Sequence, residues 1–238
     1  MTMVPRIENA GIEAWIVRFA DRIDPANRRW ITAFCRNCQS TFGKALVELV
    51  PSYTTVLVQY DPGRITDTSS RALLEQILEQ LAPDDDEASG RLVEIPVWYD
   101  ISVGPELALI AERNNWSSQQ VAETHAATEY QVFALGFVPG FAFMGLVTAP
   151  LATPRLATPR QHVPRGSIAI AERQTSAYPQ VTPGGWNLIG RTPLTLFDPG
   201  REPMTVLEAG DRVRFLSVSR DDFIELGGDP TPVAESSV

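Results

Sequence analysis

The residues best suited to chemistry in this chain of 238 residues are arginines gathered in one segment, residues 130–197. That segment holds a single acidic residue, Glu172, although the whole chain has a formal net charge of -9. Arginine presents a planar fork that matches the two oxygens of a carboxylate, so the segment predicts a pocket for an anion. Because Lys44 is the only lysine, arginine is the usual basic residue of this chain, and the pocket is predicted from the clustering of the arginines rather than from their type. The five arginines are Arg155, Arg160, Arg165, Arg173 and Arg191.

The two histidines, His125 and His162, are the candidates for proton transfer. A histidine near arginines is expected to have a lowered pKa and to be neutral at pH 7, ready to act as a base or hydrogen-bond partner. Either histidine can instead only satisfy local backbone groups, and this explanation is the stronger one for His162. The sequence has no G-x-S-x-G elbow, no P-loop and no H-E-x-x-H motif. It therefore predicts an anion pocket without a self-sufficient catalytic centre.

Glycine-rich and polar positions in the same segment extend the predicted pocket. Gly184 and Gly185 can leave backbone N–H groups open to a ligand oxygen, or they can only form the turn that carries Trp186 into the core. The unit Leu-Ala-Thr-Pro-Arg occurs twice in succession and ends at Arg155 and at Arg160. Proline favours extended backbone in the residue before it, so both arginines lie on a stiff loop, and Arg160 is the better candidate. The polar candidates are Gln174, Thr175, Tyr178, Thr182 and Asn187.

Cys35 and Cys38 are the only cysteines and form one C-x-x-C pair. Such a pair can serve a redox site or half of a zinc site. The preceding residues, 27–34, predict that the pair lies in the middle of a helix, away from the N-terminal end where the helix dipole stabilises a thiolate. Zinc would also need two further ligands, which the sequence does not pair with these cysteines. We therefore predict no metal site here.

Composition excludes several classes of protein. The chain is 44% hydrophobic and 21% charged, which is typical of a soluble globular protein. Its acidic balance argues against a nucleic-acid partner, whose usual footprint is a basic face. The sequence has no apolar run of about 18 residues for a membrane span, and its first residues lack the apolar core of a signal peptide. These features predict a cytoplasmic protein with no membrane or nucleic-acid partner.

The first ninety residues predict a small α+β layer. Asp24 and Pro25 have the residue types of a helix start, and Asp67 or Thr68 can cap a second helix. Strands are expected at 12–19, 45–50, 54–60 and 92–97, around helices that begin near 25 and 67. The order strand–helix–strand–strand–helix–strand is typical of a ferredoxin-like domain, which we place at residues 1–91. The acidic run at 84–87 is interpreted as a solvated linker.

The remaining sequence changes character. A helix is expected at 105–114, followed by one capped by Ser117, with Gln120 in capping-box position. Short strands separated by Gly/Pro turns at intervals of about ten residues then predict a closed barrel or a sandwich. These strands are expected at 130–135, 167–171, 187–189, 194–197 and 212–217. We place this domain at residues 92–226 and a flexible tail at 227–238.

Four motifs in order along the chain resemble the allophanate hydrolase subunit 1 family, which includes the B subunit of bacterial 5-oxoprolinase and the kinase inhibitor KipI. The resemblance covers nearly the whole chain. It implies a small α/β domain followed by a cyclophilin-like β-barrel domain. The motifs are Gly136-Phe137-x-Pro139-Gly140-Phe141-Ala142-Phe143, Pro159-Arg160-x-x-Val163-Pro164-x-Gly166-Ser167-x-Ala169-Ile170-Ala171, Tyr178-Pro179 and Pro183-Gly184-Gly185-Trp186-x-Leu188-Ile189-Gly190-Arg191-Thr192-Pro193.

The function that this resemblance implies is that of one component in a larger enzyme. With an A subunit, and a C subunit of the allophanate hydrolase subunit 2 family, such proteins hydrolyse 5-oxo-L-proline to L-glutamate and consume ATP. No cofactor is then expected on this chain alone, and ATP is expected on a partner or at an interface. A homo-oligomer stays open. The alternatives are a KipI-like inhibitor of a sensor histidine kinase and a carboxyltransferase or amidohydrolase component for another amide or urea-like substrate.

The resemblance also implies roles for individual residues. His125 would be a general base or substrate anchor, and Arg160 and Arg191 would clamp a carboxylate or phosphate. Gln174 and Tyr178 would orient the substrate. The further residues expected to bind substrate are Phe137, Pro139, Phe141, Thr182, Gly184, Gly185 and Trp186.

The chain departs from the family pattern at four positions near these residues. Ala126 follows His125 where the family has His-Ser. Glu172 and Ser176 replace glycines, and Ala177 replaces an isoleucine, in the run Ala-Gly-x-Gln-Thr-Gly-Ile-Tyr-Pro. If the first glycine serves a positive φ or close ligand approach, Glu172 would narrow or reshape the site. These changes affect substrate identity more than the fold.

Overall fold

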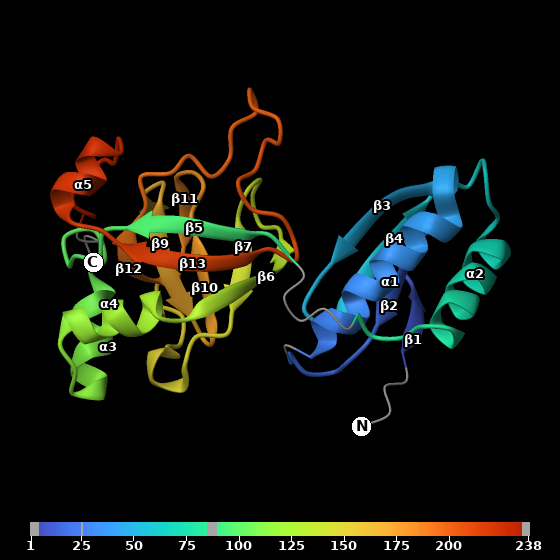
Figure 1. Ribbon diagram of the computed structural model, residues 1–238, viewed down its shortest axis with the longest axis horizontal. Coiled ribbons are helices and arrows are strands. Elements are labelled where there is room, and N and C mark those ends of the chain that lie inside the picture. Colours follow the sequence, from blue (N-terminus) through green and yellow to red (C-terminus); the bar gives the residue numbers. More distant parts are fainter. Residues whose placement is uncertain (1–4, 25, 85–89, 235–238) are drawn as a thin grey trace. The chain divides into compact units, whose positions relative to one another are not determined.

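The structure is a computed structural model that describes residues 5–24, 26–84 and 90–234. The chain divides into two compact units, residues 1–89 and 90–238 (Figure 1). Each unit has its own hydrophobic core. Within the described ranges, no helix has both the length and the hydropathy required to cross a membrane.

The first unit is a four-stranded antiparallel sheet with two helices. The strands run in the order β1 (Arg6–Asn9), β2 (Ala14–Arg18), β4 (Thr55–Tyr60) and β3 (Leu46–Pro51). Helices α1 (Asn27–Phe42) and α2 (Asp67–Glu79) contact each other, and Thr66 caps α2 by accepting a hydrogen bond from the backbone N–H of Ser69. A 3-10 turn, Gly43–Ala45, links α1 to β3. Buried side chains of both layers, among them Trp15, Val17, Phe34, Val58 and Leu74, form the core.

The predicted order of this layer was wrong at its last strand. Residues Leu92–Val97 form β5, which pairs in parallel with β13 (Arg212–Ser217) of the second unit. The position beside β2 is instead taken by β1, a short strand with two charged residues that local patterning does not reveal. Pro25, expected at the start of the first helix, lies outside the described residues, and so do residues 85–87 of the expected acidic linker.

The second unit is built on a seven-stranded sheet that curls into a barrel-like shape (Figure 1). Its first and last strands meet, because Trp98 and Arg191 exchange two backbone N–H···O=C bonds of 2.9 Å. The barrel-like sheet predicted from the turn spacing is therefore present. In order across the sheet the strands are β12 (Asn187–Arg191), β9 (Ser167–Ala171), β10 (Gln174–Ala177), β7 (Ala142–Gly145), β6 (Glu129–Leu135), β13 and β5.

Further elements surround the sheet. Strands β8 (Arg160–Val163) and β11 (Thr182–Gly184) form a separate antiparallel pair. Helix α3 (Glu106–Asn114) contacts β12, and α4 (Ser118–Ala126) contacts β13. The predicted capping box of α4, made by Ser117 and Gln120, is confirmed. The expected strand at 194–197 was wrong: Phe197 makes only an isolated bridge, to Thr205. A 3-10 turn, Ala149–Leu151, and helix α5 (Arg220–Glu225) complete the described elements.

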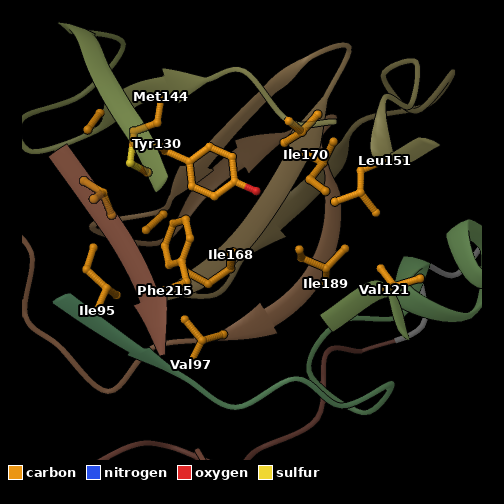
Figure 2. Packing of buried hydrophobic residues seen from close by; sticks show 14 of the residues in the cluster. Ile95, Val97, Val121, Tyr130, Met144, Leu151, Ile168, Ile170, Ile189 and Phe215 are labelled. Atoms are coloured by element: carbon orange, nitrogen blue, oxygen red, sulfur yellow. The ribbon is translucent and has the colours of Figure 1, made fainter. Parts of the chain in front are cut away.

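The main core of the second unit fills the interior of the barrel-like sheet (Figure 2). Alternation of side chains along each strand sends Ile168 and Ile170 of β9 and Ile189 of β12 into this core. Tyr130 of β6 and Phe215 of the neighbouring β13 point into the same interior from other strands of the barrel-like sheet (Figure 2). Full burial of a side chain of this size stabilises the fold by roughly 1.5–3 kcal/mol.

Residues 227–234, for which the sequence predicted a flexible tail, are held by hydrogen bonds. The backbone N–H of Gly228 donates to the carbonyl of Phe223 at 2.9 Å, and that of Val233 donates to the carbonyl of Ser102 at 2.8 Å. The rest of the predicted tail, residues 235–238, lies outside the described residues.

Candidate functional site

The candidate site lies on the face of strands β9 and β12 that points away from the main core. Because side chains alternate, Ser167, Ala169 and Ala171 share this face. A second apolar cluster covers it, and it contains three of the residues predicted to bind substrate: Phe141, Tyr178 and Trp186. The full cluster is Phe141, Val163, Ala169, Ala171, Tyr178, Trp186 and Leu188.

Aromatic rings bring most of the predicted substrate-binding residues together. The ring of Phe141 lies 5.2 Å from that of Tyr178 and 5.6 Å from that of Trp186, both edge to face. Phe137 also meets Phe141 at 5.3 Å, but its side chain is 62% exposed and its φ is +69°. Pro139 is exposed on the same loop. The predicted residues thus form a buried aromatic group with an exposed loop beside it.

Gly184 is required by close packing. An ideal Cβ at Gly184 would lie 2.3 Å from the hydroxyl of Tyr178, so only glycine allows this approach. Burial raises the pKa of Tyr178 to about 12, while the Trp186 backbone N–H and the charges of Arg155 and Arg160 act in the opposite direction. Tyr178 is therefore a neutral hydroxyl at pH 7, able to donate or accept a hydrogen bond.

Arg160 enters the site through an ion pair that sequence reasoning missed. Its Nη2 donates to Oε1 of Glu106 at 2.5 Å, and Oε2 of Glu106 accepts from the backbone N–H of Leu188 at 2.8 Å. The two side chains are 12% and 11% exposed. Among the described residues, Nε and Nη1 of Arg160 have no partner although both atoms are buried. Glu106 thus holds the orientation of Arg160, while two nitrogens of the guanidinium keep unused donors.

Arg191 lies at the end of β12 on the same face and is only 2% exposed. Its Nη1 donates to the backbone carbonyls of Asp229 and Thr231, each at 2.7 Å. Burial lowers the pKa of Arg191, and the nearby charge of Asp229 opposes this effect. The structure therefore supplies neutral oxygens, not a bound carboxylate, to this guanidinium.

His125 lies apart from these residues, in the interior of the barrel-like sheet. It is fully buried: its Nδ1 bonds the hydroxyl of Tyr99 at 2.7 Å and its Nε2 bonds that of Thr175 at 2.8 Å. Its ring stacks on Phe215 at 4.6 Å. Burial lowers the pKa of His125 to about 3, so the imidazole is neutral at pH 7. Both ring nitrogens are occupied, which favours a structural role and disfavours direct contact with a ligand.

A pocket of about 400 Å³ lies beside Tyr99, the residue whose hydroxyl bonds His125. The pocket is formed by the loop after β5, by α3 and α4, and by the end of β13. Its lining residues are Tyr99, Asp100, Ile101, Leu107, Ser118, Gln119, Ala122 and Ser217. It contains none of the residues predicted from the sequence to bind substrate.

The remaining predicted residues are placed as follows. Gln174 is half-buried in β10, opposite Ala171 of β9. Thr182 is buried in β11, and its hydroxyl has no partner among the described residues. Glu172 adopts φ +51°, which is the conformation suspected from the family glycine, yet its side chain is exposed. Its carboxylate therefore does not fill the buried aromatic group.

The cysteines lie within α1, as predicted. Cys38 is buried, Cys35 is half-buried, and burial raises the pKa of both thiols, to about 12 for Cys35. A raised pKa keeps a thiol protonated and weakens it as a nucleophile or metal ligand.

Two residues that lie beside Arg160 and Arg191 were not among the candidates from the sequence. Glu106 has a local signal, because it is an acidic residue at the start of a helix, next to Pro105. That signal explains a helix start and not the ion pair with Arg160, which lies 54 positions away. Ser167 was named only as part of the second family motif, and the structure places it opposite Arg191 in the β9–β12 register.

Comparison with known proteins identifies relatives over most of the chain. The family described as carboxyltransferase domain, subdomain C and D, matches residues 5–207. The B subunit of 5-oxoprolinase from Bacillus subtilis (strain 168) is 38% identical over 233 residues, which are 94% of this chain and 97% of that protein.

Solved structures agree with this similarity. The crystal structure of TTHA0988 superposes with a TM-score of 0.76 at 34% identity over 92% of this chain, which spans 41% of the TTHA0988 chain. The urea carboxylase of Kluyveromyces lactis superposes with a TM-score of 0.73 over 93% of this chain and 22% of its own. At 17% identity, that second likeness shows a shared fold only.

Proposed function

The chain belongs to the carboxyltransferase domain family, subdomains C and D, and on that basis we propose that it is the B subunit of an ATP-dependent 5-oxoprolinase. Together with the A and C subunits it would hydrolyse the cyclic amide of 5-oxo-L-proline to L-glutamate. The observation that carries this proposal is the 38% identity to a 5-oxoprolinase B subunit over 97% of that protein. Such coverage leaves little of the relative unmatched.

The geometry of the site supports a small anionic substrate with an apolar body. 5-Oxoproline has one carboxylate and a compact ring. Arg160 and Arg191 provide buried cationic donors, and Phe141, Tyr178 and Trp186 provide apolar surface beside them. Charge-assisted hydrogen bonds from arginine to a carboxylate are among the stronger polar contacts in proteins.

We assign His125 to positioning and not to proton transfer. Both of its ring nitrogens bond to hydroxyl groups, and the ring is fully buried. A general base must reach the proton it abstracts, either directly or through one water. In the proposed enzyme, His125 holds β10 and the loop after β5 together through Thr175 and Tyr99. The catalytic base and the ATP site are then expected on a partner chain or at an interface.

Omitting each component in turn tests this proposal. The chain would be co-expressed with its candidate A and C partners, and ATP-dependent release of glutamate from 5-oxo-L-proline would be measured with one of the three left out each time. We expect activity only in the complete assembly. Equal activity without this chain, or a complete assembly that releases no glutamate, would overturn the proposal.

A matched pair of variants tests the site within that assembly. Tyr178→Phe removes one hydroxyl and keeps the ring, and we expect it to lower kcat/KM by about tenfold, the equivalent of about 1.4 kcal/mol. Tyr53→Phe makes the same change in the first unit and should leave kcat/KM unchanged. Equal effects of the two variants would remove Tyr178 from the site.

A second candidate is a carboxyltransferase component for a urea-like or other amide substrate. The description of the matched family favours it. The same purified assembly would then consume carboxybiotin in the presence of urea and release no glutamate from 5-oxoproline. That combination of results would replace the first proposal with the second.

A further inference from the structure

Arg191 keeps one complete edge of its guanidinium unused. Its Nη1 is bound by two backbone carbonyls, whereas Nε and Nη2 have no partner in the part of the chain that the structure describes. Nε and Nη2 point in the same direction and form the side-on fork that can hold both oxygens of a carboxylate. The unused edge therefore has the geometry for a bidentate anion.

Ser167 lies on the strand beside Arg191. It pairs with Arg191 across the β9–β12 ladder, so the two side chains stand on the same face of the sheet, with Cβ atoms roughly 5 Å apart. Ser167 is 0% exposed, and within the described ranges its hydroxyl has no partner. Two buried side chains on neighbouring strands of one sheet face thus carry three unused donor groups.

Burial makes these unused donors costly. A charged group buried without a paired charge loses hydration that nothing replaces, and so does a buried hydroxyl without a partner. The charge of Asp229 lies close enough to influence Arg191. Its carboxylate, however, already accepts hydrogen bonds from the backbone N–H and the hydroxyl of Thr231, at 2.9 and 2.6 Å. An anion that occupies the edge of Arg191 would remove both penalties at once.

Residues 229–233 lie against the guanidinium of Arg191, and we call this segment the roof. Proline at 230 and at 232 favours extended backbone at Asp229 and Thr231, and carbonyls two residues apart in an extended chain point to the same side. This explains how both carbonyls reach a single nitrogen of Arg191. At the end of the roof, Val233 packs against the second apolar cluster. The roof lies beyond residues 5–207, which the family match covers.

We propose that Arg191 and Ser167 bind the carboxylate of the substrate beneath the roof of residues 229–233. The Nε–Nη2 edge of Arg191 and the Ser167 hydroxyl donate to the carboxylate oxygens. The body of the substrate then faces Tyr178, whose backbone N–H donates to the carbonyl of Ser167 at 2.9 Å. The inference rests on the proposed function for the identity of the substrate, and the site itself requires only a small carboxylate.

Nuclear magnetic resonance of the arginine Nε–H groups tests this site directly. The full-length chain, labelled with ¹⁵N-arginine, would be titrated with 5-oxo-L-proline and, separately, with acetate. We expect the Arg191 Nε–H signal to shift with 5-oxo-L-proline and to saturate with a Kd of about 1 mM or tighter, within the usual range of KM values. An unmoved Arg191 signal, or a shift that does not saturate in this range, overturns the site.

Three variants identify the groups responsible. Arg191→Lys keeps the charge but loses the fork, and Ser167→Ala removes only a hydroxyl. We expect each to raise Kd by about tenfold, a typical effect of losing one hydrogen bond to a charged group. Arg165→Gln removes an exposed charge that lies outside the proposed contacts and should change Kd by less than about twofold. If Arg191→Lys fails to fold, Ser167→Ala still decides, and an unchanged Kd in that variant overturns the role of Ser167.

Two truncations test the roof. Ending the chain after Gly228 removes residues 229–233, whereas ending it after Ala234 keeps them. We expect the shorter chain to bind 5-oxo-L-proline about tenfold more weakly, since Arg191 loses the two carbonyls that orient it. The longer chain should match the full-length protein. Equal or tighter binding by the shorter chain would show that the roof is not part of the site.

The outcomes separate this inference from the proposed function. If the complete assembly hydrolyses 5-oxo-L-proline while the Arg191 signal never moves, the carboxylate site is wrong and the proposed function stands. If the Arg191 signal saturates with 5-oxo-L-proline but the complete assembly has no activity, the site stands and the proposed function is wrong. A saturating shift with acetate alone overturns the assignment of this substrate's carboxylate to the site.

Discussion

Replacing Glu106 is expected to destabilise the second unit more than any exposed ion-pair substitution. Glu106 uses both carboxylate oxygens: one accepts from Arg160 Nη2 at 2.5 Å and the other from the Leu188 backbone N–H at 2.8 Å. It therefore joins the start of α3 to strand β12 and to strand β8, which begins at Arg160. Glu106→Ala removes both contacts in one step and adds no new group.

The size of the effect follows from burial. The side chains of Glu106 and Arg160 are 11% and 12% exposed, so solvent screens the pair little. Removing one member of a buried pair typically costs about 3–5 kcal/mol, because the other charge stays buried without compensation. Leu188 is 0% exposed, so its orphaned N–H contributes to that cost. Glu106→Gln keeps an oxygen for Leu188 and should cost less, about 2 kcal/mol.

Unfolding in urea, followed by circular dichroism, measures the difference. A loss of about 3–5 kcal/mol corresponds to a Tm lowered by roughly 10 °C in a domain of this size. Glu94→Ala is the control, because Glu94 and Arg214 form a half-exposed pair at 3.6 Å, which should contribute less than about 1 kcal/mol. Amide exchange at Leu188 provides a local measure. The reasoning is refuted if Glu106→Ala costs no more than Glu94→Ala.

Three further predictions concern the second unit. Burial lowers the pKa of His125 to about 3, against about 6.5 in the unfolded chain, so the unfolded state takes up the proton first as pH falls. The free energy of unfolding should keep its full value above about pH 6.5 and fall by roughly 3 kcal/mol by pH 4. Urea unfolding of His125→Gln should lack this loss. The control His162→Gln, which changes an exposed histidine, should retain it. Glu172→Gly should stabilise by about 0.5–1 kcal/mol, since φ there is +51°, whereas Glu172→Val should lower Tm. Gly104→Ala should lower stability by about 3 kcal/mol or more, because the new Cβ would lie 2.2 Å from the backbone of β12. Gly136→Ala is the control: its Cβ would have its nearest contact at 3.7 Å, so it should cost less than about 1 kcal/mol. Comparable melting temperatures for these two alanine variants would contradict this prediction.

Local sequence patterns predicted those elements whose determinants are neighbours in the chain. The capping box of α4 requires only Ser117 and Gln120, and it forms as expected. The strand at 167–171 is a compact apolar run and was predicted with the bounds that the structure shows. By contrast, β1 is short and half charged, so it forms only because β2 offers an edge for pairing. Patterns of period two are too weak in four residues to reveal such a strand.

The candidate site shows the same division. The motifs named Phe141, Tyr178 and Trp186 as substrate-binding residues, and in the structure the ring of Phe141 lies within 6 Å of each of the other two rings. They did not indicate that Glu106 would orient Arg160, or that His125 would be enclosed by hydroxyl groups. Partners separated by 26 to 82 positions leave no local trace in one sequence.

Residue types and short spacings were enough to indicate the family, the barrel-like sheet and the gathering of arginines near glycine- and proline-rich turns. These features can be read directly from neighbouring positions in the chain. Which donors remain unused became visible in the folded molecule alone, because that depends on every group that packs around a side chain. The segment Asp229-Pro230-Thr231-Pro232 reads as a polar tail, yet its carbonyls close over Arg191. A backbone carbonyl carries no sequence signature, so its partner is known only once the chain is folded.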